Sequence, residues 1–281
     1  SLIVFEAVNN FPSRKSIFSS EKWLKTDFQG FLRLRGRSNL PSTGVVRYSP
    51  RMQFSSEKAV VLLSGGVDSA TCLAIAAGRG YACHALTVSY GQRNALELAS
   101  ARRVAGALSV VQHKVLDLNL GWIGGSALTD EIDVPKSLDG ERPATDGTGE
   151  VPVTYVPARN SIFLAVGAAW AEALATDHLY IGVNRVDFSG YPDCRPAFIE
   201  AMQQALRRGT RRGDLTIHTP LMDLAKGEII REGTALGLDY SLTWSCYDPQ
   251  GTQACGLCDS CIHRKKGFAE AGVPDPTVYH G

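Results

Sequence analysis

The chain has 281 residues, of which 44% are hydrophobic and 20% are charged, and its formal net charge at neutral pH is +1. This length and composition suit one α/β domain with a modest appendage. No apolar run reaches the roughly 18 residues that a bilayer crossing requires. That excludes a helical membrane protein, and we expect a soluble one with no membrane partner.

The small net charge hides a division along the chain. Residues 1–51 hold nine Lys or Arg and three acidic residues, whereas residues 52–281 hold 20 basic and 25 acidic residues. The second part, which carries the motifs described below, therefore has a net charge of −5. Proteins that bind a phosphate backbone show the opposite balance, so we expect no nucleic-acid partner.

Residues 1–55 form a basic, serine-rich extension without clear periodicity. Its composition is typical of an organellar transit segment, but also of translation from upstream of a start at Met52. We interpret it as a disordered or non-native extension and assign it no function.

Residues 52–118 alternate between apolar strands and helices. We expect strands at 59–63, 82–89 and 110–116, and helices at 69–79 and 94–108. Strands that alternate with helices in this way predict a parallel sheet with helices on both faces. Ligands of such sheets bind beyond the carboxyl ends of the strands.

The second half of the domain begins with an irregular segment. Residues 119–157 contain six glycines and four prolines, and they predict either a substrate lid or a disordered loop. After them we expect helices at 161–175, 197–208 and 224–236 and strands at 178–183 and 216–218. Asn160 and Asp223 are the expected N-caps of the first and last of these helices.

The segment from Ser64 to Ser69, with the sequence SGGVDS, follows the first expected strand and opens the first helix. Backbone N–H groups and the helix dipole make such a turn an anion site, and Gly65 and Gly66 carry no side chain to block an approaching phosphate. No lysine follows the glycines, so this is not the GxxxxGK[ST] loop. The alternative is an ordinary strand-to-helix turn with small residues for close packing.

The chain has seven cysteines, and four of them follow the pattern C-x8-C-x2-C-x2-C: Cys246, Cys255, Cys258 and Cys261. Four clustered thiolates suit a tetrahedral structural zinc ion. An iron–sulfur cluster and a redox C-x-x-C pair are the alternatives. We interpret His263 as a surface residue, with replacement of one cysteine as a zinc ligand as the alternative. The other three cysteines are scattered, which favours a reducing, cytoplasmic location.

Six segments together resemble the 7-cyano-7-deazaguanine synthases of the PP-loop ATP-pyrophosphatase superfamily. They are SGGVDS (64–69), SYGQRN (89–94), VPARNSIFL (156–164), GVNRVDFSGYPDCRP (182–196), TPLMDLAKGEII (219–230) and SCYDPQGTQACGLCDSCIHRKKGF (245–268). SGGVDS alone indicates only the superfamily, whereas YPDCRP and the four-cysteine pattern are specific. Ala158 stands where we expect glycine, and alanine should be tolerated there if the backbone angle is ordinary.

The resemblance implies an α/β fold with a parallel sheet and helices on both faces, similar to the adenine nucleotide alpha hydrolases, plus a small C-terminal zinc-binding segment. We expect residues 56–242 to be the ATP-binding domain, and residues 243–281 to be the zinc segment with a C-terminal helix and tail. One structural zinc ion per chain and a homodimer are implied as well.

The implied reaction converts the carboxylate of 7-carboxy-7-deazaguanine into a nitrile in queuosine biosynthesis, with ATP and Mg²⁺. A carboxylate reacts with ammonia only after one oxygen becomes a leaving group, and the resulting amide is then activated again. Residues 52–281 have no room for a glutaminase domain, so free ammonia is the expected nitrogen source.

The resemblance also implies roles for particular residues. The expected catalytic residues are Asp68, Ser69 and Lys226, with Asp68 acting through Mg²⁺ and Lys226 reaching phosphate or remaining a solvated lysine. The expected nucleotide contacts are Leu63, Ser64, Gly65, Gly66, Val67, Asp68, Ser69, Ala70, Thr71, Cys72, Leu73, Arg159 and Asn160. For the substrate we expect Asp187 or Asp193 on the base, Tyr191 stacking, and Arg93 or Arg195 on the carboxylate.

Two other functions fit parts of this pattern. A PP-loop tRNA thiolase would need a cysteine beside the ATP loop, but Cys72 lies inside the following helix. A non-enzymatic binding module would rest on the cysteine segment, supported only by the basic residues 263–266.

Overall fold

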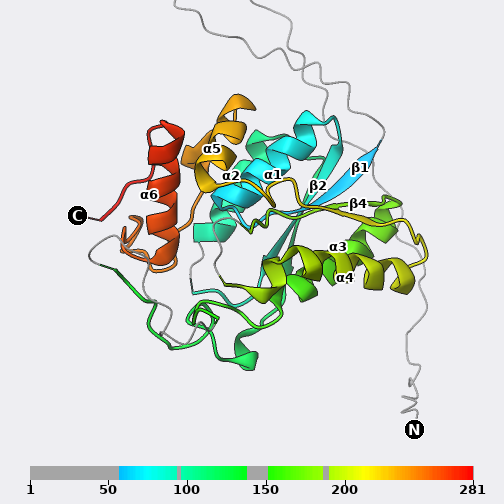
Figure 1. Cartoon of the computed structure of the whole chain (residues 1–281), viewed down its shortest axis with the longest axis horizontal. Helices are drawn as coiled ribbons and strands as arrows, with labels where there is room; N and C mark the ends of the chain where they lie inside the picture. The colour runs from blue at the N-terminus through cyan, green and yellow to red at the C-terminus, as the bar shows by residue number, and fades with distance from the viewer. Residues whose placement is uncertain (1–56, 94–95, 138–150, 186–189, 281) are drawn as a thin grey trace, which may run out of the picture. The chain divides into compact units, whose positions relative to one another are not determined.

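The computed structural model describes residues 57–93, 96–137, 151–185 and 190–280 (Figure 1). The expected extension at 1–55 therefore lies outside the described residues. Within the described part of the chain, no helix has both the length and the apolar character needed to cross a membrane.

Five parallel strands form one sheet in the order β3-β2-β1-β4-β5. The strands are β1 (Lys58–Leu62), β2 (Ala82–Ser89), β3 (Gln112–Asp117), β4 (His178–Tyr180) and β5 (Thr216–His218). The chain runs outward from β1 to β3 and then returns to the other side of β1. Open α/β sheets bind ligands at such a reversal, beyond the carboxyl ends of the strands.

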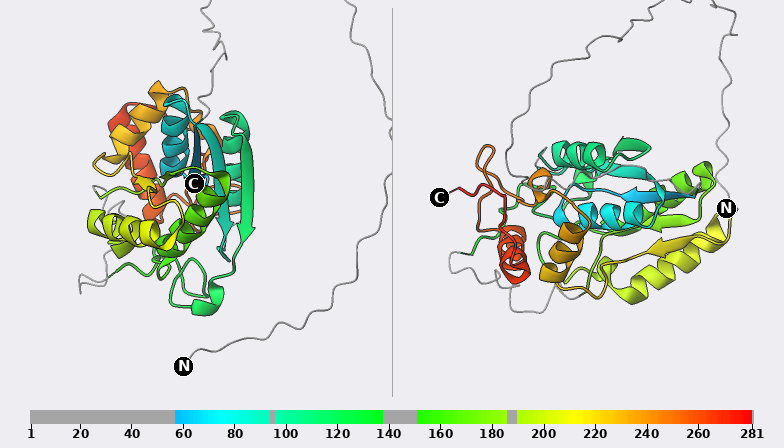
Figure 2. Two further views of the ribbon diagram at one scale, coloured as in Figure 1. Left: turned by 90° about the vertical axis from the view of Figure 1, so that its right-hand side faces the viewer. Right: turned by 90° about the horizontal axis from the view of Figure 1, so that it is seen from above.

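Helices cover both faces of the sheet (Figure 2). They are α1 (Val67–Gly78), α2 (Leu96–Ala107), α3 (Arg159–Leu174), α4 (Pro196–Gly209), α5 (Lys226–Ala235) and α6 (Asp259–Ala271). Ala59 and Val61 belong to a core with α1, α2 and α5, whereas Val60 and Leu62 belong to a second core with α3 and α4. Both faces of β1 are buried because successive side chains point to opposite faces. The predicted parallel α/β fold is confirmed.

Two expected helix caps are wrong. α3 begins at Arg159 with Ala158 as its N-cap, and α5 begins at Lys226 with Ala225 as its N-cap. The backbone N–H of Ala225 donates to Oε2 of Glu228 at 2.8 Å. Asp223 instead forms an ion pair with Arg185, 2.5 Å from Oδ1 to Nε. Glu228 satisfies the cap group from inside the helix, so Asp223 is not needed there.

Ala158 has a left-handed backbone, with φ 54° and ψ 20°. From the sequence we expected alanine to be tolerated at this position if its backbone angle were ordinary. The observed angle is not ordinary. A left-handed residue other than glycine costs about 1–2 kcal/mol. Replacing this alanine by glycine removes that cost. Part of the gain in stability is lost, however, because glycine gives the unfolded chain more conformational freedom.

Ala158→Gly should therefore stabilise the protein by about 0.5–1 kcal/mol, measured as the midpoint of urea unfolding. Ala165→Gly, at an exposed position inside α3, is the control and should destabilise by about 1 kcal/mol. Destabilisation by both glycines would refute the strain at Ala158.

The C-terminal helix α6 lies beside α5 (Figure 1). Two glycines make this contact close. A Cβ on Gly267 would lie 2.1 Å from Cγ of Lys226, and one on Gly227 would lie 2.8 Å from Cβ of Glu270. The stem of Lys226 therefore runs directly over α6, which limits where its ammonium can go.

Part of the segment expected to be a lid or a disordered loop packs against the cysteine segment. The backbone N–H of Ser137 donates to the carbonyl of Leu257 at 3.0 Å, and Nζ of Lys136 lies 2.7 Å from Oδ2 of Asp248. Val134 is buried beside the cysteines. Residues 138–150 lie outside the described residues.

Candidate active site

A pocket of about 300 Å³ opens at the carboxyl ends of the central strands. Its walls come from the ends of β1 and β2, the segment after β4, and the beginnings of α1, α3 and α6. This is the position that the strand order favours for a ligand.

The SGGVDS turn forms one wall of this pocket. The backbone N–H groups of Ser64 and Gly65 both donate to Oγ of Ser69, each at 3.2 Å, and the hydroxyls of Ser64 and Ser69 are 3.0 Å apart. Helix α1 begins at Val67, so Asp68 and Ser69 occupy its first turn. Two converging amides at a helix N-terminus form the arrangement that favours an anion, although both donate to the Ser69 hydroxyl in this structure.

Gly65 is needed for a reason that differs from the expected one. Its φ is +90°, and a Cβ there would lie 2.5 Å from the backbone nitrogen of Ala101 in α2. Its carbonyl accepts hydrogen bonds from Oγ of Ser100 at 3.0 Å and from the N–H of Trp244 at 2.9 Å. Gly65 thus lets the turn pack against α2 and joins it to the cysteine segment.

Asp68 and Lys226 are brought together from positions 158 residues apart. Nζ of Lys226 lies 2.8 Å from both carboxylate oxygens of Asp68, and both residues line the pocket. The side chains are 13% and 28% exposed for Lys226 and Asp68. Of the two roles expected for Lys226, the solvated lysine does not match the structure, because Lys226 is largely buried and paired with Asp68 of the SGGVDS turn.

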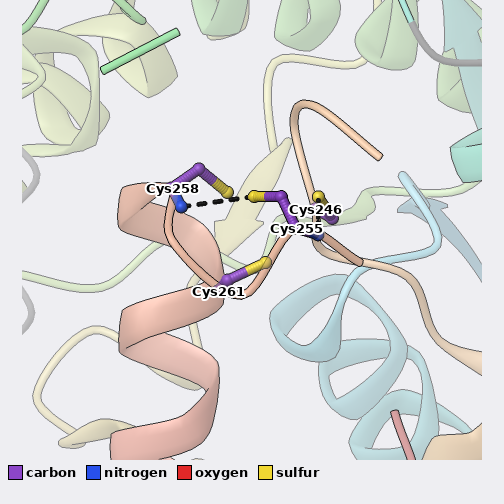
Figure 3. A group of neighbouring side chains, drawn as sticks. All are labelled: Cys246, Cys255, Cys258 and Cys261. Carbon is purple, nitrogen blue, oxygen red and sulfur yellow. Dashed lines mark hydrogen bonds between the residues drawn. The ribbon is translucent and has the colours of Figure 1, made fainter. Parts of the chain in front are cut away.

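The four cysteines of the C-terminal pattern converge (Figure 3). Their sulfur atoms all lie within 4.8 Å of one another, and all four residues are buried. Sulfurs bound to one zinc ion at about 2.3 Å would lie about 3.8 Å apart, so the set fits zinc with modest contraction. Backbone N–H groups of Cys255 and Cys258 donate to Sγ of Cys246 and Cys255 at 3.2 and 3.3 Å, which favours thiolates.

Comparisons with known proteins match most of the chain to one family. Residues 58–272 match the family described as queuosine biosynthesis protein QueC. The chain is 57% identical to the 7-cyano-7-deazaguanine synthase of Desulfatibacillum aliphaticivorans, over 79% of this chain and 97% of that protein. It is 55% identical to that of Magnetococcus marinus, with the same two coverages. The chain belongs to the QueC family.

Solved structures give a weaker likeness. The QueC-family chain is similar to a 4-thiouridine synthetase in a complex with RNA and bound ATP, at 19% identity and a TM-score of 0.44. The match covers 79% of this chain and 47% of that one. It is too distant to carry an argument about this chain.

Arg159 is the basic residue that the pocket of this QueC-family chain presents to a ligand from α3. It lies 5.6 Å from the ring centroid of Tyr90, and its Nη1 donates to the Tyr90 hydroxyl at 3.4 Å. Burial lowers its pKa, but the phenols of Tyr90, Tyr191 and Tyr247 outweigh this and raise it. Arg159 therefore stays cationic within an aromatic surround.

The other residues expected to contact the substrate differ in whether they line the pocket. Tyr191 lines the pocket, whereas Arg93 and Arg195 are not among its lining residues. Nη1 of Arg93 donates to the carbonyl of Ile132 at 2.9 Å. Asp187 lies outside the described residues.

Asp193 is turned toward a helix end. Its Oδ2 accepts from the backbone N–H of Asn160 at 3.0 Å, and its carbonyl accepts from Nδ2 of Asn160 at 3.2 Å. A carboxylate at the first turn of α3 satisfies a donor that the helix cannot. Among the described residues, Asp193 is absent from the pocket lining and Asn160 is present. Asn160 is thus held by Asp193 and is not itself the cap.

Sequence reasoning missed Glu97, which lines the pocket from the first turn of α2. Burial raises its pKa from 4.5 to about 7, although Arg159 acts in the opposite direction. The signal in the sequence was a glutamate four residues after Arg93, just beyond the strand end, and it has no distinctive neighbours.

A raised carboxyl pKa makes the fold less stable at high pH. The favourable protonated form of Glu97 contributes fully below pH 4.5, and its contribution is lost as the pH rises through about 7. Glu97→Gln removes this titration. The free energy of unfolding of the variant should exceed that of the parent by about 2 kcal/mol at pH 8 and by little at pH 5. The value at pH 8 is smaller than the full effect of the pKa shift because the pocket is open to solvent.

Thermal unfolding at the two pH values measures this difference. Glu232→Gln, at an exposed position on α5, is the control and should leave both melting temperatures unchanged. A gain for Glu97→Gln that is equal at pH 5 and pH 8 would contradict the raised pKa.

The first turn of α6 forms a further wall that the sequence did not predict. Asp259, Ser260 and His263 line the pocket, and Nε2 of His263 lies 3.4 Å from Oδ1 of Asp259. His263, interpreted from the sequence as a surface residue, is partly exposed and lines the pocket. Cys258 is the N-cap of α6 and Cys261 lies in its first turn, so two of the four converging cysteines belong to this wall directly.

Proposed function

We propose that this enzyme of the 7-cyano-7-deazaguanine synthase family uses ATP and free ammonia to convert 7-carboxy-7-deazaguanine into the nitrile. The observation that carries this proposal is one pocket shared by an anion-binding turn, the Asp68–Lys226 pair and the aromatic surround of Arg159. Phosphate chemistry and a flat anionic substrate can therefore meet in one place.

The first step activates the carboxylate. One carboxylate oxygen attacks the α-phosphorus of ATP, forming an acyl-adenylate and releasing pyrophosphate. The amides and hydroxyls of residues 64–69 would stabilise the charge on the departing pyrophosphate. Leu63 and Val67 line this side of the pocket. Four further residues expected to contact the nucleotide are buried behind the turn and are not among the lining residues: Ala70, Thr71, Cys72 and Leu73.

Mg²⁺ would be held by Asp68, because a carboxylate and phosphate oxygens are the ligands that this ion prefers. The ion would supply positive charge to the phosphates. Lys226, 2.8 Å from Asp68, would add a second positive charge. Ser69 would donate its hydroxyl to a phosphate oxygen in place of its contact with Ser64.

Ammonia then attacks the acyl carbon and expels AMP, leaving the amide and one proton. A second adenylation places AMP on the amide oxygen. Loss of AMP and of the nitrogen-bound protons then forms the C≡N bond. Arg159 is suited to neutralise the substrate carboxylate before activation, because it stays cationic beside Tyr90 and Tyr191.

The four cysteines would hold one structural zinc ion per chain, with no open ligand position. A redox pair would leave two cysteines unexplained, whereas all four sulfurs lie in one group. A homodimer and a cytoplasmic location remain proposals that rest on the family resemblance and on cysteine usage.

The thiolase alternative has less support. It needs an activated cysteine beside the ATP loop, and within the described residues Cys194 is the cysteine in the pocket. Burial raises the pKa of Cys194 to about 11, so its thiol is protonated at neutral pH. Burial also raises the pKa of Cys72, which lies in the core.

Mass spectrometry tests the proposal. The full chain is incubated with 7-carboxy-7-deazaguanine, Mg-ATP and ammonium, and the nitrile and the released nucleotide are measured. Ammonia-dependent formation of the nitrile together with release of AMP supports adenylation. Release of ADP would show instead that the carboxylate is activated by phosphorylation. Unchanged substrate in the presence of bound zinc and ATP would refute the proposed reaction.

A further inference from the structure

The start of α6 brings an acidic side chain to the wall of the pocket. Asp259 lines the pocket and is the first residue of α6, directly after the N-cap Cys258. Its side chain is 20% exposed, so it is largely withdrawn from water. The cysteine group and the helix fix its backbone, which makes it a rigid feature of the wall.

Asp259 borders the aromatic part of the pocket. Tyr191 and Tyr247 line the same pocket, and Tyr247 packs against the cysteine cluster that contains Cys258, the residue directly before Asp259. Burial raises the pKa of both phenols, and the Asp259 carboxylate also raises it. Tyr191 is held by a 2.8 Å hydrogen bond between its hydroxyl and Oγ1 of Thr154, and it lies 5.5 Å from Tyr155, centroid to centroid. Tyr191 is therefore fixed in place.

The cation Arg159 lines the same pocket as these two phenols. Its Nη1 donates to the hydroxyl of Tyr90, another lining residue, at 3.4 Å. A ligand lying against these rings would therefore meet a cation and an anion along its edges. A 7-carboxy-7-deazaguanine has matching groups, because its carboxylate is on the five-membered ring and its N1–H and 2-amino donors are on the six-membered ring.

A carboxylate is the side chain that best accepts two adjacent N–H donors. Other acidic groups of the described site face different partners: Asp68 pairs with Lys226, and Asp193 accepts from the backbone of Asn160. Glu97 lies by Tyr90 and Arg159, on the α2 side. Asp259, whose Oδ1 lies 3.4 Å from Nε2 of His263, is the carboxylate that the start of α6 brings to the pocket wall, next to the cluster against which Tyr247 packs.

We propose that Asp259 recognises the N1–H and 2-amino edge of the 7-deazaguanine, a role that the sequence led us to expect for Asp187 or Asp193. This inference rests on the proposed function. It also gives the cysteine segment a part in specificity, since the metal-binding residues position the side chain that reads the base.

The test compares two substrates on three proteins. The substrates are 7-carboxy-7-deazaguanine and its analogue without the 2-amino group. The proteins are the parent, Asp259→Asn and Glu270→Gln, the last being a matched change of charge on α6 outside the pocket lining. Zinc content per chain, measured alongside, reports whether α6 remains anchored.

The parent should prefer the guanine substrate by about 100-fold in kcat/KM, because a site built for a donor rejects an analogue that lacks it. Asp259→Asn should lose about 100-fold on the guanine substrate and much less on the analogue, so the preference collapses. Its KM for ATP should stay within about twofold. Glu270→Gln should match the parent on both substrates.

Two results would overturn the inference. One is a parent enzyme that uses both substrates equally well. This outcome does not depend on whether any variant folds. The other is an Asp259→Asn enzyme that is slower on both substrates by the same factor, since a merely structural role would act in that way. Failure of the parent to convert either substrate would refute the proposed function instead.

Discussion

Asp68→Asn is expected to lower nitrile formation by about 10²–10³-fold with the fold retained, because it removes charge that would hold Mg²⁺ against the phosphates. Both oxygens of Asp68 lie 2.8 Å from Nζ of Lys226 in a partly buried pair. Asparagine keeps the shape of the side chain, so the change is mainly electrostatic. The measurement is kcat for nitrile formation at saturating Mg-ATP, with the melting temperature recorded beside it.

A second ion pair provides the control. Asp177 accepts from Arg212 at 2.5 and 2.7 Å and lies at the start of β4, at the other end of the strand from the pocket. Asp177→Asn should therefore leave kcat unchanged. A full-rate Asp68→Asn enzyme would remove Asp68 from the phosphate site, and a loss shared by Asp177→Asn would point to stability alone.

Lys226→Gln separates the two partners of the buried pair. If Lys226 contacts phosphate itself, this variant should raise the KM for ATP, and the double variant with Asp68→Asn should be no more active than Asp68→Asn alone. If Lys226 only neutralises Asp68, the double variant should recover stability relative to Lys226→Gln, since an unpaired buried charge is then removed.

Cys258→Ser is expected to lose zinc, stability and activity together. Cys258 is fully buried, supplies one of the four converging sulfurs and caps α6. Binding of a structural zinc ion contributes on the order of 10 kcal/mol to small metal-dependent folds. The loss should therefore exceed that of an ordinary core substitution, which is typically about 0.5–3 kcal/mol.

The physical reason for the loss of activity is the wall that α6 provides. Asp259 and His263 reach the pocket only while the first turn of α6 is held beside the cysteines. Cys83→Ala, at a buried cysteine outside the group, is the control and should keep its zinc and its activity. Zinc per chain, soluble yield and nitrile formation are the measurements. A metal-free Cys258→Ser protein with full activity would contradict a structural metal site.

Much of the fold could be predicted because it depends on local patterns. The apolar runs that become β1 and β2 and the small residues between β1 and α1 follow from neighbouring residues alone. The SGGVDS turn and the cysteine spacing are equally local. Element ends were less predictable, since the cap of α3 is an alanine in a left-handed conformation and the carboxylate that satisfies this helix comes from Asp193.

Much of the candidate site could not be predicted in this way. Glu97 has no distinctive neighbours in the sequence, and His263 follows the cysteine pattern without matching a known role. Both line the pocket, one from α2 and the other from α6. Arg93 and Arg195 stand in suggestive motifs, yet their side chains are outside the pocket lining of the described residues. Sequence spacing indicates which groups are available, and not which way they point.

The sequence by itself determined the parallel α/β class, the anion-binding turn and the four-cysteine group, because each depends on residues close together in the chain. Only the tertiary structure decided that Lys226 meets Asp68, that Gly65 serves the packing of α2, and that α6 closes the pocket. These contacts join segments far apart in the chain. Their geometry is set by the packing of helices on the sheet, which no local pattern contains.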